Sequence, residues 1–347
     1  MKKFLIIVSV LFFLLIGGSV GYYFYAMSPV GESSELQLYE LKSGTSKIGV
    51  ADSLKEAGFI RSSLVLKAYL FFHSEVNLQA GIYEFSKNMT PEEIVRKMSH
   101  GEVKNDSYTV TLIEGRRITE YVHNISEKLE VSEEELLSLM GDQSYLQELI
   151  NTYWFLDESI LSSDLYYPLE GYFFPDTYEF YEKSTAKEII TKILNHTGEK
   201  LEGFKENIEN SNYNVHEILS MAAIIELEAV SESDRNTVSQ VIYKRLDEGM
   251  SLGMDVTTYY AVKKEMGSGL TRTDLNTISP YNTHASNTSM FGRLPVGPIC
   301  NPSLMSINAV FNPTDTDYLY FYADIKTGIV YFTKTLDEHN AIIREVG

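Results

Sequence analysis

The chain begins with an apolar stretch that can form only a few kinds of structure. After Lys2 and Lys3 no charged residue occurs until Glu32. A helix that spans a membrane needs about 20 apolar residues, and residues 4–27 supply that length. Amphipathic rings favour the membrane interface, and three tyrosines lie near the end of the stretch: Tyr22, Tyr23 and Tyr25. The sequence therefore predicts a single transmembrane helix.

The charges that flank this helix predict its orientation. Because basic residues stay on the cytoplasmic side, residues 1–3 form a cytoplasmic tail and the rest of the chain is extracytoplasmic. We therefore expect a cell-membrane location with a single-pass anchor. The alternative is a cleaved signal peptide, which has a shorter apolar core and a site of small residues. The letters GSVG match such a site weakly, but apolar residues continue through Tyr25.

Composition excludes several classes of protein. A length of 347 residues is typical of about two or three domains. With 48 acidic and 29 basic residues the net charge is −19, so nucleic acid is not an expected partner. The only cysteine is Cys300, which excludes an intrachain disulfide. No HExxH pattern is present, and we expect no metal and no cofactor.

Residues 28–104 form the first predicted domain. A strand, two helices and a second strand follow one another, and a helix begins at Pro91. Thr90 with Glu93 three residues after it predicts a capping box for that last helix. A small α+β module of this pattern either binds a polymer or serves as a spacer, and the fold alone does not decide between them.

Residues 105–347 form the second predicted domain, which is also α+β. A strand near residue 108 precedes helices, and the aromatic segment 165–181 is interrupted by glycine and proline. A helical pattern then covers about 215–249. Residues 317–335 alternate as two strands around a turn at 326–328.

The helical segment MAAIIELEAV, at residues 221–230, carries Glu226 and Glu228. On a helix these carboxylates lie about 200° apart, so they face different surroundings. Glu228 has a mixed environment, with Ile224, Ile225, Ser231 and Glu232 as neighbours. The positions three and four residues from Glu226 are apolar and mostly small: Ala222, Ala223, Ala229 and Val230.

This asymmetry predicts a chemical role for Glu226. A carboxylic acid in apolar surroundings keeps its proton more readily than in water. It can then act as a general acid on a glycosidic oxygen, and the small neighbours leave space for a bulky substrate. The alternative is a buried carboxylate paired with a cation such as Arg235 or Lys244. The local pattern leaves both interpretations open.

Several long motifs occur together in one order along the chain. They are LEGYFFPDTYEF (169–180), AAIIELEAVSESDRNTVSQVIYKRL (222–246), LGMDVTTYYA (252–261), SPYNTH (279–284), GRLPVGPICNPS (292–303) and YFTKTLDEHN (331–340). In these motifs the chain resembles the endolytic murein transglycosylases, also called the YceG-like family. The resemblance implies a LysM-like peptidoglycan-binding module at 28–104 and a YceG-like catalytic domain at 105–347.

The resemblance also implies an activity. Such enzymes are lyases that cut the MurNAc–GlcNAc bond within nascent glycan strands, form 1,6-anhydro-MurNAc ends and so limit strand elongation. The family's catalytic glutamate corresponds to Glu226, which acts first as acid and then as base. Because no water is consumed, one carboxylate suffices. The implied partners are peptidoglycan strands, the membrane, and the peptidoglycan synthesis and division machinery.

Other motif residues are candidates for substrate binding. They are Glu170, Tyr172, Asp176, Thr177, Asp255, Tyr281, Asn282, Thr283 and Asn301. For each one the alternative is a role in a turn or cap, because turns use the same residue types. Met254 and Val256 depart from the family pattern around Asp255. Cys300 is expected to be a small packed residue.

Two further functions remain as alternatives for the whole chain. One is a non-catalytic, membrane-anchored protein that binds peptidoglycan or serves as a division scaffold. The other is a muramidase that uses water, which requires a second carboxylate. The sequence offers no convincing partner carboxylate for this reaction.

Overall fold

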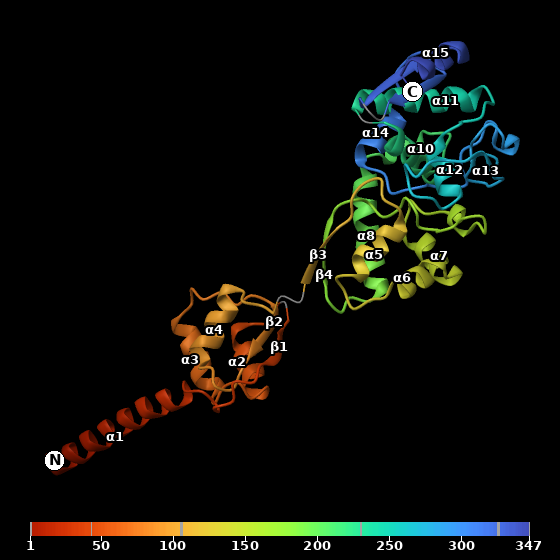
Figure 1. Cartoon of the computed structure of the whole chain (residues 1–347). Helices are drawn as coiled ribbons and strands as arrows, with labels where there is room; N and C mark the ends of the chain where they lie inside the picture. Colours follow the sequence, from red (N-terminus) through yellow and green to blue (C-terminus); the bar gives the residue numbers. More distant parts are fainter. Residues whose placement is uncertain (1, 43, 105–106, 230, 325–326, 347) are drawn as a thin grey trace. The chain divides into compact units, whose positions relative to one another are not determined.

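The computed structural model describes the whole chain except residues 1, 43, 105–106, 230, 325–326 and 347, and except the side chains of residues 2–12. The chain divides into two compact units, Met1–Asp106 and Ser107–Gly347. Both units mix helices with small two-stranded antiparallel sheets, and helix predominates (Figure 1).

The first unit contains the N-terminal helix and a small α+β body. Its elements in order are α1 (Lys2–Ala26), β1 (Gln37–Leu41), α2 (Lys47–Glu56), α3 (Ser63–Phe72), β2 (Gly81–Phe85) and α4 (Pro91–His100). Strands β1 and β2 pair antiparallel with Tyr39 opposite Tyr83. The core between the sheet and the helices includes Val50, Leu54 and Ile94.

The strands and helices predicted within residues 28–104 are confirmed. The capping box of α4 is present: Glu93 N–H donates to Thr90 Oγ1 (3.2 Å), and Thr90 N–H donates to a carboxylate oxygen of Glu93 (2.8 Å). Gly101 follows α4 with φ of 65°, the left-handed conformation that glycine adopts at a helix end. Local signals therefore suffice to define this helix.

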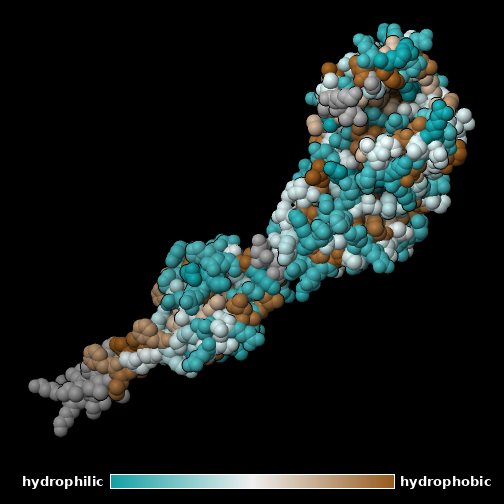
Figure 2. Space-filling model, in the orientation of Figure 1, coloured by the Kyte–Doolittle hydropathy of each residue, from teal (hydrophilic) through white to brown (hydrophobic). Residues whose placement is uncertain are grey.

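Helix α1 leads into this body and ends against it. Ala26 and Met27 pack against Val65 of α3. Apolar side chains further back along α1, such as Leu14 and Leu15, are exposed and give the helix the brown surface visible in Figure 2. Within the part of the chain whose side chains are described, no helix has both the length and the apolar composition needed to cross a membrane.

The second unit contains the remaining elements. They are β3 (Ser107–Thr111), α5 (Ile118–Ser126), α6 (Glu133–Gly141), α7 (Gln143–Thr152), η1 (Glu158–Leu161), β4 (Thr177–Tyr181), α8 (Ala186–Glu202), α9 (Lys205–Glu209), α10 (Val215–Glu228), α11 (Glu232–Asp247), α12 (Asp255–Ala261), α13 (Arg272–Leu275), η2 (Thr288–Met290), α14 (Leu304–Phe311), β5 (Tyr320–Asp324), β6 (Ile329–Thr333) and α15 (Leu336–Val346). Strand β3 pairs with β4, and β5 pairs with β6.

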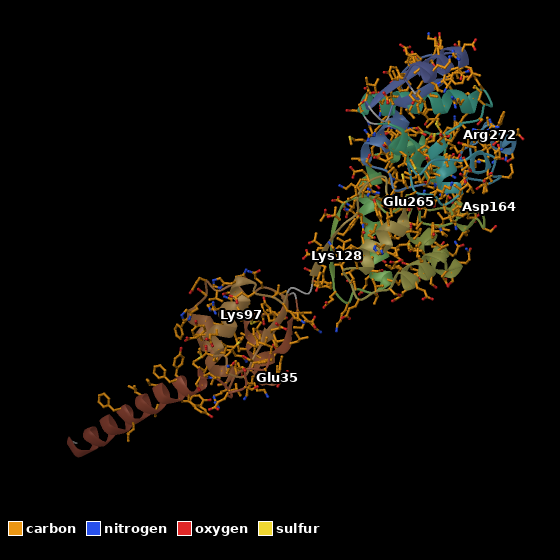
Figure 3. The ribbon with its side chains drawn as sticks, in the orientation of Figure 1. Glu35, Lys97, Lys128, Asp164, Glu265 and Arg272 are labelled. Atoms are coloured by element: carbon orange, nitrogen blue, oxygen red, sulfur yellow. The ribbon has the colours of Figure 1, made fainter. Side chains whose placement is uncertain are left out.

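Helix α10 is the central element of this unit. It packs against α11, α12 and α14 (Figure 1). From Met221 to Ile225 every residue is buried, as expected of a helix that is apolar on all sides. Charged side chains such as Asp164, Glu265 and Arg272 lie instead on the surface of the unit (Figure 3).

The helical pattern predicted over 215–249 is two helices. Helix α10 ends where Ala229 adopts an extended conformation (φ −112°, ψ 144°). Ser231 then caps α11, and its hydroxyl accepts a hydrogen bond from Asp234 N–H (3.1 Å). The Ser-x-x-Asp pattern is a start signal for a helix, and here it prevails over the continuous periodicity.

The two strands predicted at 317–335 are confirmed as β5 and β6. Tyr322 lies opposite Tyr331 in their antiparallel register. Of the predicted turn, residue 326 lies outside the described residues, and Gly328 has φ of 71°.

Glycine is required where the loop before β4 meets the loop before α14. Gly171 has φ of 84°, and a Cβ atom at this position would lie 2.5 Å from Pro298 Cβ. Gly249 also has a positive φ (65°), but an added Cβ would meet no atom within 4 Å. The two glycines thus share a conformation and differ in packing.

We expect Gly171→Ala to lower the free energy of unfolding by about 2–4 kcal/mol, since left-handed strain and overpacking add. Gly249→Ala should lower it by only about 1 kcal/mol, from the backbone conformation alone. Thermal unfolding of the two variants compares these effects. Equal losses would mean that the contact with Pro298 relaxes at no cost.

Candidate active site

Glu226 lies in the last turn of α10, and its side chain is 5% exposed. Along the helix its neighbours Ala222 and Ala223 are buried, as predicted, and Ala229 is buried beyond the helix end. Val230 lies outside the described residues. On the side facing the β3–α5 loop, a Cβ atom added to Gly115 would come within 3.6 Å of Glu226 Cγ. The methylene part of the side chain is therefore surrounded by small residues.

One oxygen of the Glu226 carboxylate meets the beginning of α14. Oε2 accepts hydrogen bonds from Ser303 N–H (2.9 Å), from the Ser303 hydroxyl and from the Ser306 hydroxyl (2.7 Å). Ser303 is also the N-cap of α14, where its hydroxyl accepts from Ser306 N–H (3.3 Å). A carboxylate is favoured at this end of a helix, where free N–H groups and the helix dipole provide positive potential.

The other oxygen faces an arginine. Arg235 of α11 places Nη2 3.6 Å from Glu226 Oε1, and its own side chain is 10% exposed. Its Nε also donates to the Ser306 hydroxyl at 3.1 Å. The expected apolar environment is therefore wrong for the carboxylate group itself. The pairing with Arg235 considered as the alternative is present, whereas Lys244 pairs with Asp317 (3.2 Å).

The cause of this difference is the end of α10. Because the helix stops at Glu228, Ala229 does not continue it, and α11 begins at Glu232. Tertiary neighbours from α11 and α14 therefore surround the carboxylate. Periodicity along one helix could not predict them.

Glu228, two residues further on, has a different environment. It is half-buried, and burial, followed by the negative charge of Asp255, raises its pKa to about 7. The sequence places it in a mixed setting near solvent, with no sign of this perturbation. Its neighbour Asp255 comes from the first turn of α12, which sequence distance alone could not bring to α10.

Glu170 and Asn301, both predicted to bind substrate, are buried and bonded to one another. Asn301 Nδ2 donates to Glu170 Oε1 (3.2 Å), which also accepts from Ile118 N–H (2.8 Å). Tyr260 donates to Oε2 at 3.0 Å. Burial raises the pKa of Glu170 to about 8. These contacts fix loops to one another, so the two residues have an internal structural role.

Four more of the predicted substrate-binding residues are fully buried: Tyr172, Tyr281, Asn282 and Thr283. Tyr172 bonds His216 Nδ1 (3.0 Å), and Tyr281 OH accepts from Tyr166 N–H (3.2 Å). Asn282 and Thr283 bond to residues of α12 through their side chains. The turn and packing roles considered as alternatives fit these four positions, and their contact with substrate stays a prediction.

Asp176, Thr177 and Asp255 are the predicted substrate-binding residues that reach the surface. Asp176 accepts from Thr177 N–H and lies 2.7 Å from His196 Nε2, and these two contacts hold its pKa below the usual range. With Thr177 it lines a cavity of about 730 Å³ between β4 and α8. Their role stays a prediction.

Cys300 is a packed residue, as expected. It is fully buried, its Sγ lies 3.5 Å from Ala223 O, and burial raises the pKa of the thiol. Within the described portion of the chain, no group of three or more His, Cys, Asp and Glu side chains is placed to hold a metal ion.

The contributions of Ser303 and Ser306 are missed by sequence reasoning. The signal that was available is the Ser-x-x-Ser start of the helix at Leu304. It predicts a cap, but nothing in it links the cap to a glutamate 77 residues earlier. The second unit is thus an α+β domain with one nearly buried acid at the junction of three helices, an arrangement suited to acid–base chemistry.

Comparison with known proteins places the chain in a family. The YceG-like family matches residues 39–345, so the chain belongs to the YceG-like family. A Bacillus subtilis (strain 168) protein named endolytic murein transglycosylase is 33% identical over 330 residues, covering 94% of this chain and 89% of the relative.

Two further relatives extend this comparison. A protein of the same name from Streptococcus pneumoniae (strain D39) is 27% identical over 361 residues, covering 98% of this chain and 64% of its own length. A crystal structure of a YceG-like protein from Listeria monocytogenes superimposes with a TM-score of 0.63 at 32% identity, covering 89% of this chain and all of that one.

Glu170 gives the folded unit a specific dependence on pH. Its pKa is about 8 in the folded chain and 4.5 without the surrounding structure. Between these pH values, folding therefore takes up a proton. As the pH rises through this range, the free energy of unfolding falls by up to about 1.4 kcal/mol per pH unit. We expect Glu170→Gln, which has no proton to lose, to flatten this dependence between pH 5 and 8.

Thermal unfolding at pH 5, 6.5 and 8 measures this effect. Glu209→Gln is the matched control, because it removes an exposed carboxylate from α9. It should keep the slope of the wild-type chain. Parallel curves for the wild-type chain and Glu170→Gln would show that Glu170 is ionised throughout.

Proposed function

We propose that this chain is an endolytic murein transglycosylase, a lyase that cuts the MurNAc–GlcNAc bond within nascent glycan strands and limits their elongation. The family and the name of the Bacillus relative, at 33% identity over nearly the whole chain, support this function. The observation that carries it is Glu226, a single acid held in one geometry beside small residues at the end of a buried helix.

In this reaction Glu226 acts twice. As an acid it gives its proton to the glycosidic oxygen, and the bond from that oxygen to the muramyl C1 breaks. The GlcNAc side leaves with a new hydroxyl. Glu226, now a carboxylate, takes the proton of the muramyl 6-hydroxyl, whose oxygen bonds C1 and closes the 1,6-anhydro ring. One carboxylate alternates between acid and base, and no water is consumed.

Surface groups of the same unit supply substrate contacts in this proposal. Asp176, Thr177 and Asp255 offer carboxylate and hydroxyl oxygens to sugar hydroxyls and acetamides. The small α+β body of the first unit is the LysM-like module that holds the strand. This part of the proposal rests on the sequence resemblance and on the exposure of the three side chains.

A second candidate is a muramidase that uses water. Glu228 and Asp255 favour it, because they are two neighbouring carboxylates. The pKa of Glu228 is raised to about 7, which suits a general base. This base would activate water against C1, and the product would carry a reducing end. The ends of the product strands therefore separate the two reactions.

Digestion of purified glycan strands tests the reaction directly. We expect the wild-type chain to produce internal cuts with anhydro ends, as identified by mass spectrometry. Glu226→Gln should lower kcat by at least about 100-fold, because the amide carries no transferable proton. The amide oxygen can still accept the three hydrogen bonds at Oε2, so the fold should be retained.

Glu217→Gln is the matched control. It makes the same change on the same helix, at a capping position where glutamine also serves, and activity should be unchanged. Reducing ends would identify the muramidase. Bound but uncut strands would identify the non-catalytic scaffold, and equal activity of Glu226→Gln would exclude Glu226 as the acid.

The proposed location is the cell membrane, with residues 4–27 as a single-pass anchor and the two domains outside. The length of the charge-free stretch and the exposed apolar side chains of α1 support this location. It would place the chain close to the peptidoglycan synthesis and division machinery.

Substitution of two apolar residues tests the anchor. Leu14→Arg combined with Leu15→Arg costs about 6–8 kcal/mol of insertion free energy on biological scales. We expect the wild-type chain to stay in the membrane fraction after alkaline carbonate washing and the double variant to be released. Release of the wild-type chain would contradict the anchor.

A further inference from the structure

The first turn of α14 holds the Glu226 carboxylate in an asymmetric way. Ser303 N–H can only donate, so Oε2 is an acceptor. The Ser303 hydroxyl accepts from Ser306 N–H, and the Ser306 hydroxyl accepts from Arg235 Nε. Each hydroxyl thus accepts one hydrogen bond from a group that can only donate, and it donates its own proton to Oε2.

The second oxygen is bound much less firmly. Oε1 has Arg235 Nη2 at 3.6 Å, beyond the length of a normal hydrogen bond. When the acid is protonated, the proton is therefore expected on Oε1, because three donors already surround Oε2. The two oxygens of the same carboxylate are thus made different by α14.

We propose that Ser303 and Ser306 are positioning residues for Glu226, which hold Oε2 so that Oε1 alone delivers and recovers the catalytic proton. The inference rests on the proposed function and deepens it at the same site. Because the same three bonds fix the torsion angles of a flexible side chain, they also hold Oε1 in one direction. Such alignment matters, since a displacement of about 1 Å can cost about 100-fold in rate.

The loop beside Glu226 is tied to the same turn. Gly115 N–H donates to Asn301 O (2.9 Å), and Asn301 N–H donates to Arg116 O (3.0 Å). Asn301 lies two residues before Ser303. Two backbone hydrogen bonds thus join the loop that carries Gly115 to the segment that carries the hydroxyl donors.

The pH dependence follows from the charged groups around the acid. The titratable or charged groups that face Glu226 include Arg235 from α11 and Cys300 from the loop before α14. Burial raises the pKa of the thiol, so Cys300 stays neutral at ordinary pH. Hydrogen bonds to a carboxylate favour its ionised form. Removal of the serine donors should therefore make Glu226 harder to ionise.

The test measures kcat, KM and the pH profile of the full chain in detergent on purified glycan strands. We expect Ser303→Ala combined with Ser306→Ala to lower kcat by about 10- to 100-fold while KM changes little. The limb of the pH profile that reports ionisation of the acid should move to higher pH. Ser303→Ala alone should also lower kcat. Ser303→Thr, which keeps the hydroxyl, should retain most of the wild-type kcat.

Ser132→Ala is the control for loss of a helix cap. Ser132 caps α6 through the same kind of bond, to Glu135 N–H (3.1 Å), outside the candidate site. It should leave kcat and the pH profile unchanged. Ser306→Ala alone keeps the cap of α14 and removes one donor, so it separates positioning from folding of the helix.

Two results would overturn the proposal. One is a double variant whose kcat stays within about threefold of the wild-type value, since positioning is expected to cost more. The other is a loss of kcat without movement of the pH profile and without rescue by threonine. If the wild-type chain makes no cut, the proposed function fails and the positioning role fails with it. Cutting by the wild-type chain with an unaffected double variant overturns only the positioning role.

Discussion

A helix that is apolar on every side has to be covered on every side, and α10 sets this constraint for the second unit. Each apolar side chain that leaves water contributes about 1.5–3 kcal/mol, so α11, α12 and α14 pack against it. Two of these helices bring polar groups to Glu226: α11 supplies Arg235, and the start of α14 supplies Ser303 and Ser306. The position of the acid and the identity of its partners therefore follow from the same burial.

The loops around this helix are held by a second buried carboxylate. Glu170 joins the start of α5, the end of α12 and the segment before α14 through Ile118, Tyr260 and Asn301. A buried carboxylate is costly unless its hydrogen bonds are satisfied. Three donors satisfy the oxygens of Glu170. At neutral pH the side chain also keeps its proton, which avoids the cost of a buried charge. The motifs that resemble the family thus include residues that hold the loops around α10 together.

Much of the fold is local in origin and could be predicted from the sequence. The capping box at Thr90, the strands of the first unit and the hairpin strands near the C-terminus depend on neighbours within a few residues. The end of α10 was not predicted, because apolar periodicity continues past Ala229 while Ser231 starts a new helix. Competing local signals of this kind are decided by tertiary packing.

The candidate site could be predicted only in part for the same reason. Glu226 stands out because its helical neighbours are small and apolar, which is a property of one segment. Its polar partners lie 9, 77 and 80 residues further along the chain, at positions that only packing brings together. Buried motif residues such as Asn282 and Thr283 also could not be distinguished from groove residues, since turns and sugar contacts use the same side chains.

The two glutamates of α10 show how little a helix alone determines the chemistry of its acids. Along the helix, the neighbours of Glu226 are apolar, whereas those of Glu228 are partly polar. In space the polarity of their surroundings is reversed. Three hydrogen-bond donors contact Glu226, whereas burial and the negative charge of Asp255 raise the pKa of Glu228. The ionisation of a carboxylate depends on the groups within a few ångströms of its oxygens, and for both glutamates those groups come from other helices. One buried helix thus carries two acids with opposite electrostatic surroundings, two residues apart.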